Sequence, residues 1–498
     1  MRCMAALRIR TALWSLPIVI ILLAASPSPP VGAASAGNGV SEHQAATPAG
    51  KAATEGQAAP RRTSSAAGSL VQLPGKRGCA GARSARRSGC ATARAMKGAG
   101  PFLGSRAVAL SPDGRNAYVA SYRSDAVAVF VRNKRTGTLA QAKGKAGCVA
   151  ANAAQGCGAA VGLDGPNSVA VSDDGRYVYV TSRNSDSLTV FRRKRGKGAL
   201  RQLEAPSGCF AGAALSGCLA ANALEGPDVV VISKDGKNVY VGSFFGDAVA
   251  IFNRDARNGK LTQPGGTAGC IAAATDGCAV GLALDAPEGL GISSDGNTVY
   301  VASAVSNAVV VLDRDQSGGG LTQASDGGGC IIDAPLTGCS TGRQLAGANA
   351  IALSPNDESV YVTSLLSNSV TAFNRSSNGD LAQKSGIAGC MVNLRLAKCS
   401  LGRKMAAPEG VVVAPDGRSV YVAAFGSGAI DVLDRNRKTG AIKQKSGRAG
   451  CIGAQSALGC TRGRAMKGVS SIAVSPDSRH VYSTSFGSSA INIFRRIR

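Results

Sequence analysis

The chain has 498 residues, of which 65 are glycine, and its side chains are 44% hydrophobic, 17% charged and only 4% aromatic. The apolar content allows a sizeable buried core, and many glycines with few charges indicate short strands joined by numerous turns. No apolar run of membrane-spanning length follows the first 25 residues, which excludes a membrane span in the mature chain. The formal net charge of +26 favours anionic partners.

The N-terminus has the pattern of an export signal. Arg2, Arg8 and Arg10 precede an apolar run over residues 12–25, and Ala33 ends a stretch of small residues suited to cleavage. We therefore expect residues 1–33 to be a signal peptide, with an uncleaved membrane anchor as the alternative. Residues 34–68 are rich in Ala, Ser, Gly and Pro without periodicity, which predicts a disordered linker.

The rest of the chain, residues 69–498, is built from repeats. The stretch Ser168–Ser182 reads Ser-Val-Ala-Val-Ser-Asp-Asp-Gly-Arg-Tyr-Val-Tyr-Val-Thr-Ser, and close copies recur every 60 or 61 residues. One tyrosine marks each copy: Tyr118, Tyr179, Tyr240, Tyr300, Tyr361, Tyr421 and Tyr482. We expect these tyrosines to pack between repeats and not to act as acid–base groups.

Each repeat predicts four strands. An apolar strand A ends at a hairpin turn of the type Ser-Pro-Asp-Gly or a relative of it, and strand B carries Val-Tyr-Val. Strand C follows a short polar turn, and strand D carries Leu-x-Gln or Ile-x-Gln. The seven strand-D glutamines are Gln72, Gln141, Gln202, Gln263, Gln323, Gln383 and Gln444.

The first and last repeats are incomplete in a complementary way. Gln72 precedes the first strand A, whereas the last repeat stops after its strand C at Phe494. The N-terminal strand should therefore complete the final unit, which closes a ring and leaves no free sheet edge. The predicted fold is all-β, a seven-bladed β-propeller with four-stranded antiparallel blades, because the alternative of a linear solenoid would not need the split unit.

Fifteen cysteines are present, and Cys3 would leave with the signal peptide. The other fourteen form seven local pairs between each strand D and the next strand A: Cys79/Cys90, Cys148/Cys157, Cys209/Cys218, Cys270/Cys278, Cys330/Cys339, Cys390/Cys399 and Cys451/Cys460. An even number of cysteines in an exported chain predicts disulfides. Thiolate metal sites are the alternative, but they use closer pairs, often with His, and only His43 and His480 are available, so we expect no metal at the cysteines.

The D–A loops of a propeller meet at one face, around the mouth of its central channel. The position ten residues after the second cysteine of each pair varies between repeats, and its equivalent in the first repeat is Arg106. The predicted ligand-binding set is Arg106, Asn167, Asp228, Glu288, Asn349, Glu409 and Ser470. Nearby, Asp164, Glu225 and Asp285 form an acidic arc, and a basic arc continues the circle: Arg403, Lys404, Arg462, Arg464, Lys467, Arg94 and Lys97.

Two interpretations of this set remain open. In one, it binds a polar or bipolar ligand, or a hard cation such as calcium held by carboxylate and amide oxygens. In the other, these residues only satisfy backbone groups at the start of strands beside a water-filled channel. No other cofactor is expected.

The C–D loops, on the opposite face, are strongly basic. Their clusters are Arg132–Arg135, Arg192–Arg195, Arg435–Lys438 and Arg495–Arg498. They predict binding to an anionic extracellular or cell-wall polymer, with a solvated charged rim as the alternative. Nucleic acid is not expected as a partner because the loops lack aromatic side chains for stacking, and we expect a monomer.

The recurring Val-Ala-Val-Ser-x-Asp-Gly-Arg-x-Val-Tyr-Val-Thr-Ser stretch resembles the YVTN-type repeat of the lactonase-like seven-bladed propeller family, which includes 6-phosphogluconolactonases. The resemblance covers about residues 69–498. It implies hydrolysis of a sugar lactone by acidic and basic side chains in the pocket, although no catalytic motif maps onto this chain residue by residue. Export, a cysteine pair in every blade and the near absence of His argue against a cytoplasmic sugar-phosphate substrate.

Two functions are therefore predicted. The first is a secreted or cell-wall-associated propeller that binds a ligand or acts as a scaffold without catalysis. The second is a lactonase-like hydrolase, in which Asp228, Glu288 or Glu409 would activate water and Arg106 would stabilise the developing oxyanion.

Overall fold

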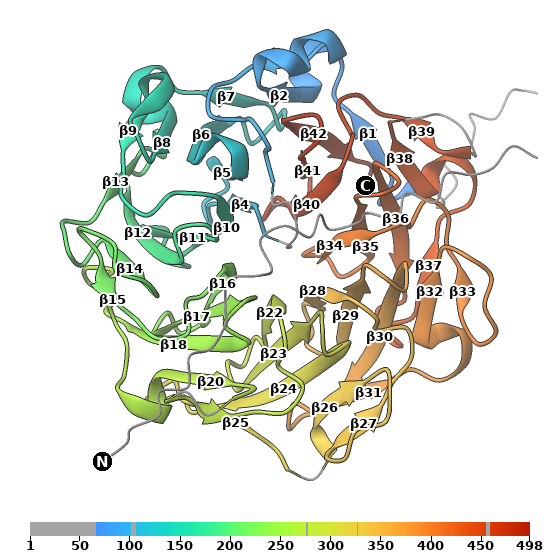
Figure 1. The fold of residues 1–498 in the computed structure, drawn as a ribbon. Helices are drawn as coiled ribbons and strands as arrows, with labels where there is room; N and C mark the ends of the chain where they lie inside the picture. The colour runs from blue at the N-terminus through green and yellow to red at the C-terminus, as the bar shows by residue number, and fades with distance from the viewer. Residues whose placement is uncertain (1–65, 101–105, 275–276, 326, 455–458) are drawn as a thin grey trace, which may run out of the picture. The chain divides into compact units, whose positions relative to one another are not determined.

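The computed structural model describes residues 66–100, 106–274, 277–325, 327–454 and 459–498. Its strands form seven separate sheets, which surround a central axis like the blades of a propeller (Figure 1). The predicted seven-bladed β-propeller is therefore confirmed. The predicted signal peptide and most of the predicted linker, residues 1–65, lie outside the described residues. In the part of the chain that the structure describes, no helix has the length and apolar character needed to cross a membrane.

Three strands of each blade follow one another outward from the axis. The innermost strand A is β4 (Val108–Leu110), β10 (Pro166–Val171), β16 (Pro227–Ile232), β22 (Pro287–Ile292), β28 (Ala348–Leu353), β34 (Pro408–Val413) or β40 (Val469–Val474). Strand B, buried throughout, is β5 (Asn116–Ser121), β11 (Tyr177–Ser182), β17 (Asn238–Ser243), β23 (Thr298–Ser303), β29 (Ser359–Ser364), β35 (Ser419–Ala424) or β41 (His480–Ser485). Strand C is β6 (Ala126–Arg132), β12 (Ser187–Arg193), β18 (Ala248–Arg254), β24 (Ala308–Arg314), β30 (Ser369–Arg375), β36 (Ala429–Arg435) or β42 (Ala490–Arg496).

Two short strands share the fourth position of each blade, because they pair with successive halves of strand C. Strand D is β1 (Leu70–Gln72), β7 (Leu139–Gln141), β13 (Leu200–Gln202), β19 (Leu261–Thr262), β25 (Leu321–Gln323), β31 (Leu381–Gln383) or β37 (Ile442–Gln444). The strand that contains the first cysteine is β2 (Cys79–Gly81), β8 (Cys148–Ala150), β14 (Cys209–Ala211), β20 (Cys270–Ala272), β26 (Gly327–Ile332), β32 (Cys390–Val392) or β38 (Cys451–Gly453).

The sheets are larger than the four antiparallel strands that were predicted. A last short strand runs parallel to the cysteine strand and brings each sheet to six: β3 (Ala91–Thr92), β9 (Gly158–Ala159), β15 (Leu219–Ala220), β21 (Ala279–Val280), β27 (Cys339–Thr341), β33 (Ser400–Leu401) or β39 (Thr461–Arg462). Short 3₁₀ helices lie in the loops: η2 (Gly75–Gly78), η3 (Arg83–Ser88), η4 (Tyr122–Ser124), η5 (Gly144–Gly147), η6 (Ala154–Gly156), η7 (Gly266–Gly269), η8 (Gly386–Gly389) and η9 (Gly447–Gly450).

The N-terminal strand closes the ring as predicted. β1 pairs antiparallel with β42, so that Leu70 lies opposite Arg496. Leu70 is buried in the same hydrophobic cluster as Phe494, and the Tyr421 hydroxyl donates to the carbonyl of Gly68 at 2.6 Å. The last blade thus takes its outer strands from the start of the described chain.

A tyrosine and an arginine join neighbouring blades. Between the first two, the Tyr118 hydroxyl donates to the Gly198 carbonyl at 2.9 Å and accepts from Arg193 Nε at 2.8 Å, and Arg193 also pairs with Asp113 at 2.9 Å. The predicted inter-blade position of the tyrosines is therefore confirmed. The equivalent arginines at the seven junctions are Arg132, Arg193, Arg254, Arg314, Arg375, Arg435 and Arg496.

All seven predicted cysteine pairs form disulfides, one in each blade. The bridges are Cys79–Cys90, Cys148–Cys157, Cys209–Cys218, Cys270–Cys278, Cys330–Cys339, Cys390–Cys399 and Cys451–Cys460. The two cysteines of a bridge are only 8 to 11 residues apart in the chain. The alternative of thiolate metal sites does not hold for these residues, because every one of their sulfur atoms is bonded to another.

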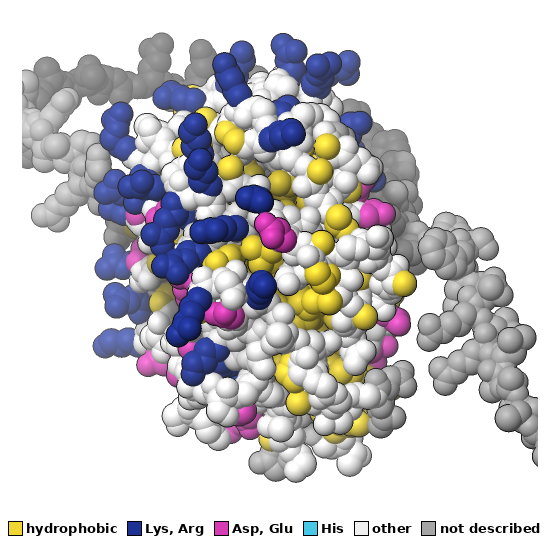
Figure 2. All heavy atoms as spheres, turned by 90° about the vertical axis from the view of Figure 1, so that its left-hand side faces the viewer, with side chains coloured by type: hydrophobic (Ala, Val, Ile, Leu, Met, Phe, Trp, Pro, Cys, Tyr) yellow, Lys and Arg dark blue, Asp and Glu magenta, His cyan; other side chains and the backbone are white. Residues whose placement is uncertain are grey.

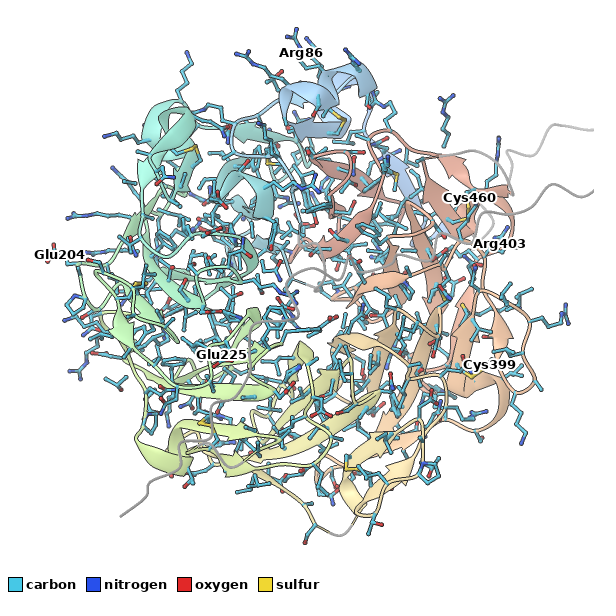
Figure 3. All side chains as sticks on the ribbon, viewed as in Figure 1. Arg86, Glu204, Glu225, Cys399, Arg403 and Cys460 are labelled. Atoms are coloured by element: carbon cyan, nitrogen blue, oxygen red, sulfur yellow. A yellow bond between two sulfur atoms is a disulfide. The ribbon has the colours of Figure 1, made fainter. Side chains whose placement is uncertain are left out.

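The structure corrects the surroundings of these cysteines, which were predicted to lie in loops between strand D and the next strand A. The first cysteine of each pair belongs to a strand that pairs with strand C. Cys339 begins β27, and each of the other second cysteines lies directly before the last strand of its sheet: Cys90, Cys157, Cys218, Cys278, Cys399 and Cys460. Figure 3 shows Cys399 and Cys460 at the outer edge of the ring, so these bridges are parts of the blades and lie away from the axis.

Candidate functional site

Six of the seven predicted site residues lie on β-bulges within the innermost strands. In each of these blades the pairing of strand A with strand B shifts register at the second residue of strand A. A bulge bends its strand and turns its side chain, which places a ring of polar groups at the propeller's centre. We call these residues the polar ring: Asn167, Asp228, Glu288, Asn349, Glu409 and Ser470.

The polar ring is buried, although its members were predicted to lie at the mouth of the channel. Their exposed fractions are only 0–4%. The reason is that each strand A begins one residue before the bulge, so the polar residue belongs to the packed sheet and not to the preceding loop.

Asp228 is held by two partners. Asn167 Nδ2 donates to Oδ1 at 2.5 Å, and Arg183 pairs with Oδ2 at 3.1 Å. Burial raises the pKa of Asp228 to about 6, against the lowering effects of Arg183 and of the hydrogen bond from Asn167. The carboxylate is therefore mostly ionised at neutral pH. The Arg183 guanidinium also lies over the rings of Phe244 and Phe245, 4.5 and 4.7 Å from their centroids.

Two carboxyl groups with raised pKa values continue the ring. Burial first, and the negative charge of Asp228 second, raise the pKa of Glu288 to about 8, against the lowering effect of Arg183. Burial, and then the charge of Glu288, raise the pKa of Glu409 well above its usual range. Oε2 of Glu409 is buried with no hydrogen-bond partner among the described residues. At neutral pH the polar ring thus holds an ionised carboxylate, Asp228, and a largely protonated one, Glu288.

Backbone strain precedes both glutamates. Ala286 and Ala407 adopt φ angles of 55° and 46°, in the left-handed region that costs a non-glycine residue about 1–2 kcal/mol. Their N–H groups donate to side-chain oxygens of Asp247 at 2.8 Å and Asn368 at 2.7 Å, which fixes the turn. Strain of this kind concentrates at functional sites. The four other blades that contribute to the polar ring have glycine at this position: Gly165, Gly226, Gly347 and Gly468.

Asn349 and Ser470 are bonded to neighbouring strands. Asn349 donates to the Pro408 carbonyl at 3.0 Å and accepts from the Thr363 hydroxyl at 2.8 Å. The hydroxyls of Ser470 and Thr484 lie 3.2 Å apart. These contacts give both side chains a place in the framework of the polar ring, and their predicted ligand contacts stay a prediction.

Arg106 stands apart from the carboxyl groups. Its guanidinium NH2 donates to the Leu290 carbonyl at 2.9 Å, and burial lowers its pKa. Among the described residues it forms no ion pair with any carboxylate. Arg106 was predicted to belong with the polar ring, but its guanidinium contacts the Leu290 carbonyl and none of the ring's carboxyl groups.

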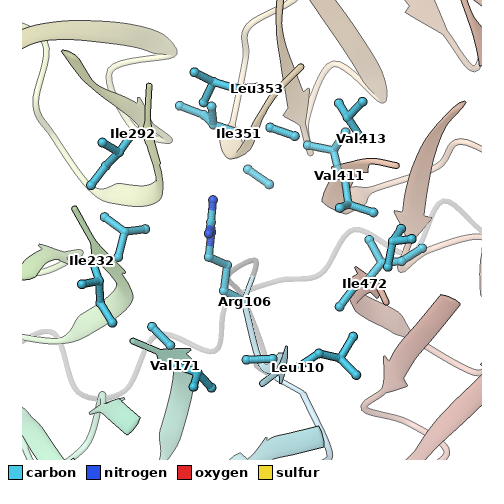
Figure 4. A pocket seen from close by; sticks show the side chains of 18 of the residues that line it. Arg106, Leu110, Val171, Ile232, Ile292, Ile351, Leu353, Val411, Val413 and Ile472 are labelled. Carbon is cyan, nitrogen blue, oxygen red and sulfur yellow. The ribbon is translucent and has the colours of Figure 1, made fainter. Parts of the chain in front are cut away.

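Arg106 instead points into a pocket that occupies the rest of the channel. This pocket has a volume of about 590 Å³ and is lined by aliphatic side chains of the strands A, with Arg106 at its centre (Figure 4). Residues of the A–B turns form its rim, where Asp173 and Lys234 lie 3.7 Å apart. The pocket therefore opens on the face of the A–B and C–D connections.

Three arginines of the predicted basic arc have a structural role, because they connect loops of neighbouring blades. Arg94 donates to the carbonyls of Ala142 and Gly144, at 3.1 and 2.8 Å, and so ties the loops of neighbouring blades together. Arg403 and Arg464 make the same contact with their neighbours, and Figure 3 shows Arg403 at the outer edge of the ring, near Cys460. These guanidiniums are satisfied by backbone carbonyls far from the axis. The other members are at least partly exposed: Lys97, Lys404, Arg462 and Lys467.

The predicted acidic arc remains near the surface. Asp164 accepts from Asn184 Nδ2 at 3.0 Å, and Asp285 accepts from the Ser306 hydroxyl at 3.1 Å. Glu225, also marked in Figure 3, is exposed. The described residues contain no group of three or more His, Cys, Asp or Glu placed to hold a metal ion, so the hard cation stays a prediction without a defined set of ligands.

Sequence reasoning missed Arg183, the ion-pair partner of Asp228. A signal was available, because the residue directly after strand B is charged only in this blade and is aromatic or aliphatic in the other six. Those equivalents are Tyr122, Phe244, Ala304, Leu365, Phe425 and Phe486.

The fold and the polar ring define a seven-bladed β-propeller with carboxyl groups at its axis. Comparison with known protein families then identifies the family. The family described as lactonase, 7-bladed β-propeller, matches residues 84–208, 221–329 and 292–454. The chain therefore belongs to this family. No curated protein matches it.

Solved structures with similar folds include lactonases and an enzyme of another kind. A candidate 6-phosphogluconolactonase from Bacteroides fragilis is 19% identical, with 68% of this chain and 81% of that chain covered and a TM-score of 0.46. The periplasmic gluconolactonase of Pseudomonas aeruginosa is 18% identical, with coverage of 67% and 82% and a TM-score of 0.48. Hydrazine synthase of Kuenenia stuttgartiensis is 16% identical, with coverage of 80% and 97% and a TM-score of 0.49.

Proposed function

We propose that this protein hydrolyses a lactone, with Asp228 as general base and Glu288 as general acid. The observation that carries the proposal is a pair of carboxyl groups on neighbouring bulges. Their surroundings give them different pKa values, about 6 for Asp228 and about 8 for Glu288. Arg183 and Asn167 hold Asp228 in its ionised form, whereas burial keeps Glu288 protonated. Two carboxyl groups separated in this way can take and give a proton at one pH. Membership of the lactonase family supports the reaction class.

The proposed reaction begins with attack of water on the lactone carbonyl carbon, while Asp228 accepts one proton of that water. The ring C–O bond then breaks, and Glu288 gives its proton to the departing ring oxygen. The product is a hydroxy acid, and transfer of the proton from Asp228 to Glu288 restores the starting state. Arg106 takes no part in this scheme because, among the described residues, its guanidinium contacts neither the Asp228 nor the Glu288 carboxyl group.

The substrate would enter from the face of the B–C turns. Arg183, whose side chain is 11% exposed, links the buried Asp228 to Phe245, which is 61% exposed. Entry on this side requires Arg183 to shift from Phe244 and Phe245 while it keeps its charge near Asp228. This proposal therefore predicts that substitution of Phe245 changes KM more than kcat.

Rates of lactone hydrolysis measured from pH 4 to 10 test the proposal, with glucono-1,5-lactone and unsubstituted γ- and δ-lactones as substrates. We expect kcat/KM to rise as Asp228 ionises near pH 6 and to fall as Glu288 ionises near pH 8. Asp228→Asn should lower kcat/KM by about 100-fold or more, and Glu288→Gln should do the same and remove the alkaline limb.

Asp164→Asn and Glu225→Gln are matched controls, because these acidic residues lie on the same side of the ring but outside the axis. Their rates should equal that of the unchanged protein. Absence of turnover for every lactone, or unchanged turnover in both the Asp228 and Glu288 variants, would rule the hydrolase out and leave the non-catalytic binding role.

A second proposal concerns the basic C–D loops, which we propose bind an anionic polymer outside the cell. Seven disulfides support an oxidising location. The structure corrects the predicted clusters, because Arg132, Arg193, Arg435 and Arg496 are buried at blade junctions. Figure 2 shows Lys and Arg side chains gathered along one part of the surface. The exposed charges of these clusters are Lys134, Arg135, Arg192, Lys194, Arg195, Arg437, Lys438, Arg495 and Arg498.

Elution from immobilised polyphosphate by a salt gradient tests this proposal. Replacing Arg192, Lys194 and Arg195 by Gln should lower the salt concentration at elution, because fewer counter-ions are released on binding. The matched control replaces Arg83, Arg86 and Arg87 of η3 by Gln and removes the same charge elsewhere. Equal shifts in the two triple variants would show a non-specific charge effect and defeat the proposal.

A further inference from the structure

The pocket beneath the polar ring contains an arginine that pairs with no carboxylate of the described residues. Every junction arginine except Arg435 pairs with an aspartate, and Arg183 pairs with Asp228. Among the described residues, Arg106 has a side-chain hydrogen bond to the Leu290 carbonyl alone, yet it lies inside the channel. Arg106 is partly buried, and withdrawing a guanidinium from water is unfavourable unless an anion compensates its charge. The missing anion is therefore best supplied by a ligand.

The side chains that line the pocket around Arg106 indicate whether the rest of that ligand is polar or apolar. The last residue of every strand A is aliphatic and lines the pocket, and Figure 4 shows aliphatic side chains on all sides of the Arg106 guanidinium. A hydroxyl-rich ligand would leave its polar groups facing these side chains, whereas an alkyl chain would bury apolar area against them. We call these residues the aliphatic ring: Leu110, Val171, Ile232, Ile292, Leu353, Val413 and Val474.

The depth of the pocket limits the length of the ligand's alkyl chain. The guanidinium contacts Leu290, and the rim of the same blade is at Ser294. β22 ends at Ile292 and Ser294 lies in the turn that follows, so these four residue steps span at most roughly 13 Å. With C–C bonds of about 1.5 Å in a zigzag, this depth suits an alkyl chain of roughly eight to ten carbons.

We infer that the lower channel binds a medium-chain carboxylate, with its carboxylate on the Arg106 guanidinium and its alkyl chain along the aliphatic ring. The carboxylate would accept hydrogen bonds from the planar guanidinium, which suits two-point contact. The rim does not oppose entry, because Lys234 lies beside Asp173 and the Asp357 carboxylate accepts from the Ser294 hydroxyl at 2.6 Å. This site does not depend on lactone hydrolysis, since the polar ring lies at the other end of the strands.

Isothermal titration of the full chain with sodium decanoate tests the inference. We expect saturable binding of one decanoate per chain, at least tenfold weaker binding of hexanoate, and little binding of 1-decanol or gluconate. Arg106→Gln should weaken decanoate binding at least tenfold, and Arg106→Lys should restore part of it. Arg115→Gln is the matched control, because this exposed arginine lies on the same face outside the pocket and its variant should bind within twofold of the unchanged protein.

A second variant guards against loss of folding in Arg106→Gln. Ile292→Glu adds a negative charge to the aliphatic ring and should also weaken decanoate binding at least tenfold, with an unchanged circular dichroism spectrum. The inference is overturned if the unchanged protein does not bind decanoate, if both pocket variants bind it normally, or if gluconate binds as tightly. Lactone turnover measured on the same variants should not change, which separates this site from the proposed hydrolase.

Discussion

Glu409 has the least compensated carboxyl group of the polar ring, since Oε2 has no partner among the described residues. A buried carboxyl group avoids ionisation, and Glu288 nearby adds to that effect, so the pKa of Glu409 is raised on folding. Between the unfolded and folded pKa values, the unfolded chain releases a proton that the folded chain keeps. The folded state therefore loses stability relative to the unfolded state as pH rises through this interval.

Glu409→Gln removes this titratable group. The free energy of unfolding of the variant should therefore increase relative to that of the unchanged protein as pH rises from 5 to 8. The difference in free energy of unfolding between the variant and the unchanged protein should change by about 1 kcal/mol over this pH range, measured by denaturant unfolding at several pH values. Glu358→Gln is the control, because Glu358 is exposed. A difference between Glu409→Gln and the unchanged protein that stays constant over this range would contradict the buried, protonated state.

The blade junctions depend on arginines at the ends of the strands C. Arg193 contacts the Tyr118 hydroxyl and pairs with Asp113, and its NH1 donates to the Gly175 carbonyl at 2.8 Å. Burial acts to raise the pKa of Asp113, but hydrogen bonds from Ser111 and Arg193 lower it to about 2. This carboxylate therefore contributes stability above its unfolded pKa, and that contribution is lost as pH falls towards 2.

Arg193→Lys should lower the free energy of unfolding by about 1–3 kcal/mol, because an ammonium group cannot satisfy the tyrosine, the aspartate and the carbonyl together. Arg192→Lys is the matched control, since Arg192 is the adjacent, exposed residue on the same strand. Urea unfolding of both variants checks the prediction. Equal stabilities would mean that the junction contact contributes nothing measurable.

The ring as a unit depends on its closure by β1. Deleting residues 69–73 removes the partner of the outer half of β42 and the buried Leu70, so the free energy of unfolding should fall. We expect Tm to drop by about 5 °C or more, whereas deletion of residues 50–54 from the predicted linker should leave it unchanged. Differential scanning calorimetry compares the two. An unaltered Tm in the first variant would show that closure does not stabilise the propeller.

The disulfides act more locally than this closure. Each one closes a short segment within a single blade and could stabilise it by roughly 2–3 kcal/mol through loss of chain entropy in the unfolded state. They hold the outer strands of each sheet, whereas the buried tyrosines and arginines hold neighbouring blades together.

Local, repeated signals were enough to predict the propeller. Asp-Gly turns, the tyrosine of each strand B and the glutamine of each strand D recur at a constant interval, and the cysteines pair within one interval. Even the closure by Leu70–Gln72 follows from counting strands, because a ring of repeats must complete its last member. The positions of the polar ring could also be found by comparing repeats.

The environment of each candidate residue was decided by contacts between segments far apart in the chain. The bulges that bury Asp228 and Glu288 depend on the register of two strands, and the role of Arg193 depends on a tyrosine 75 residues away. Arg106 occupies an equivalent place in the repeat, yet its partner, Leu290, is 184 residues distant across the channel. Periodicity specifies which residues are equivalent, but burial, ion pairing and pKa depend on neighbours that only the closed ring brings together.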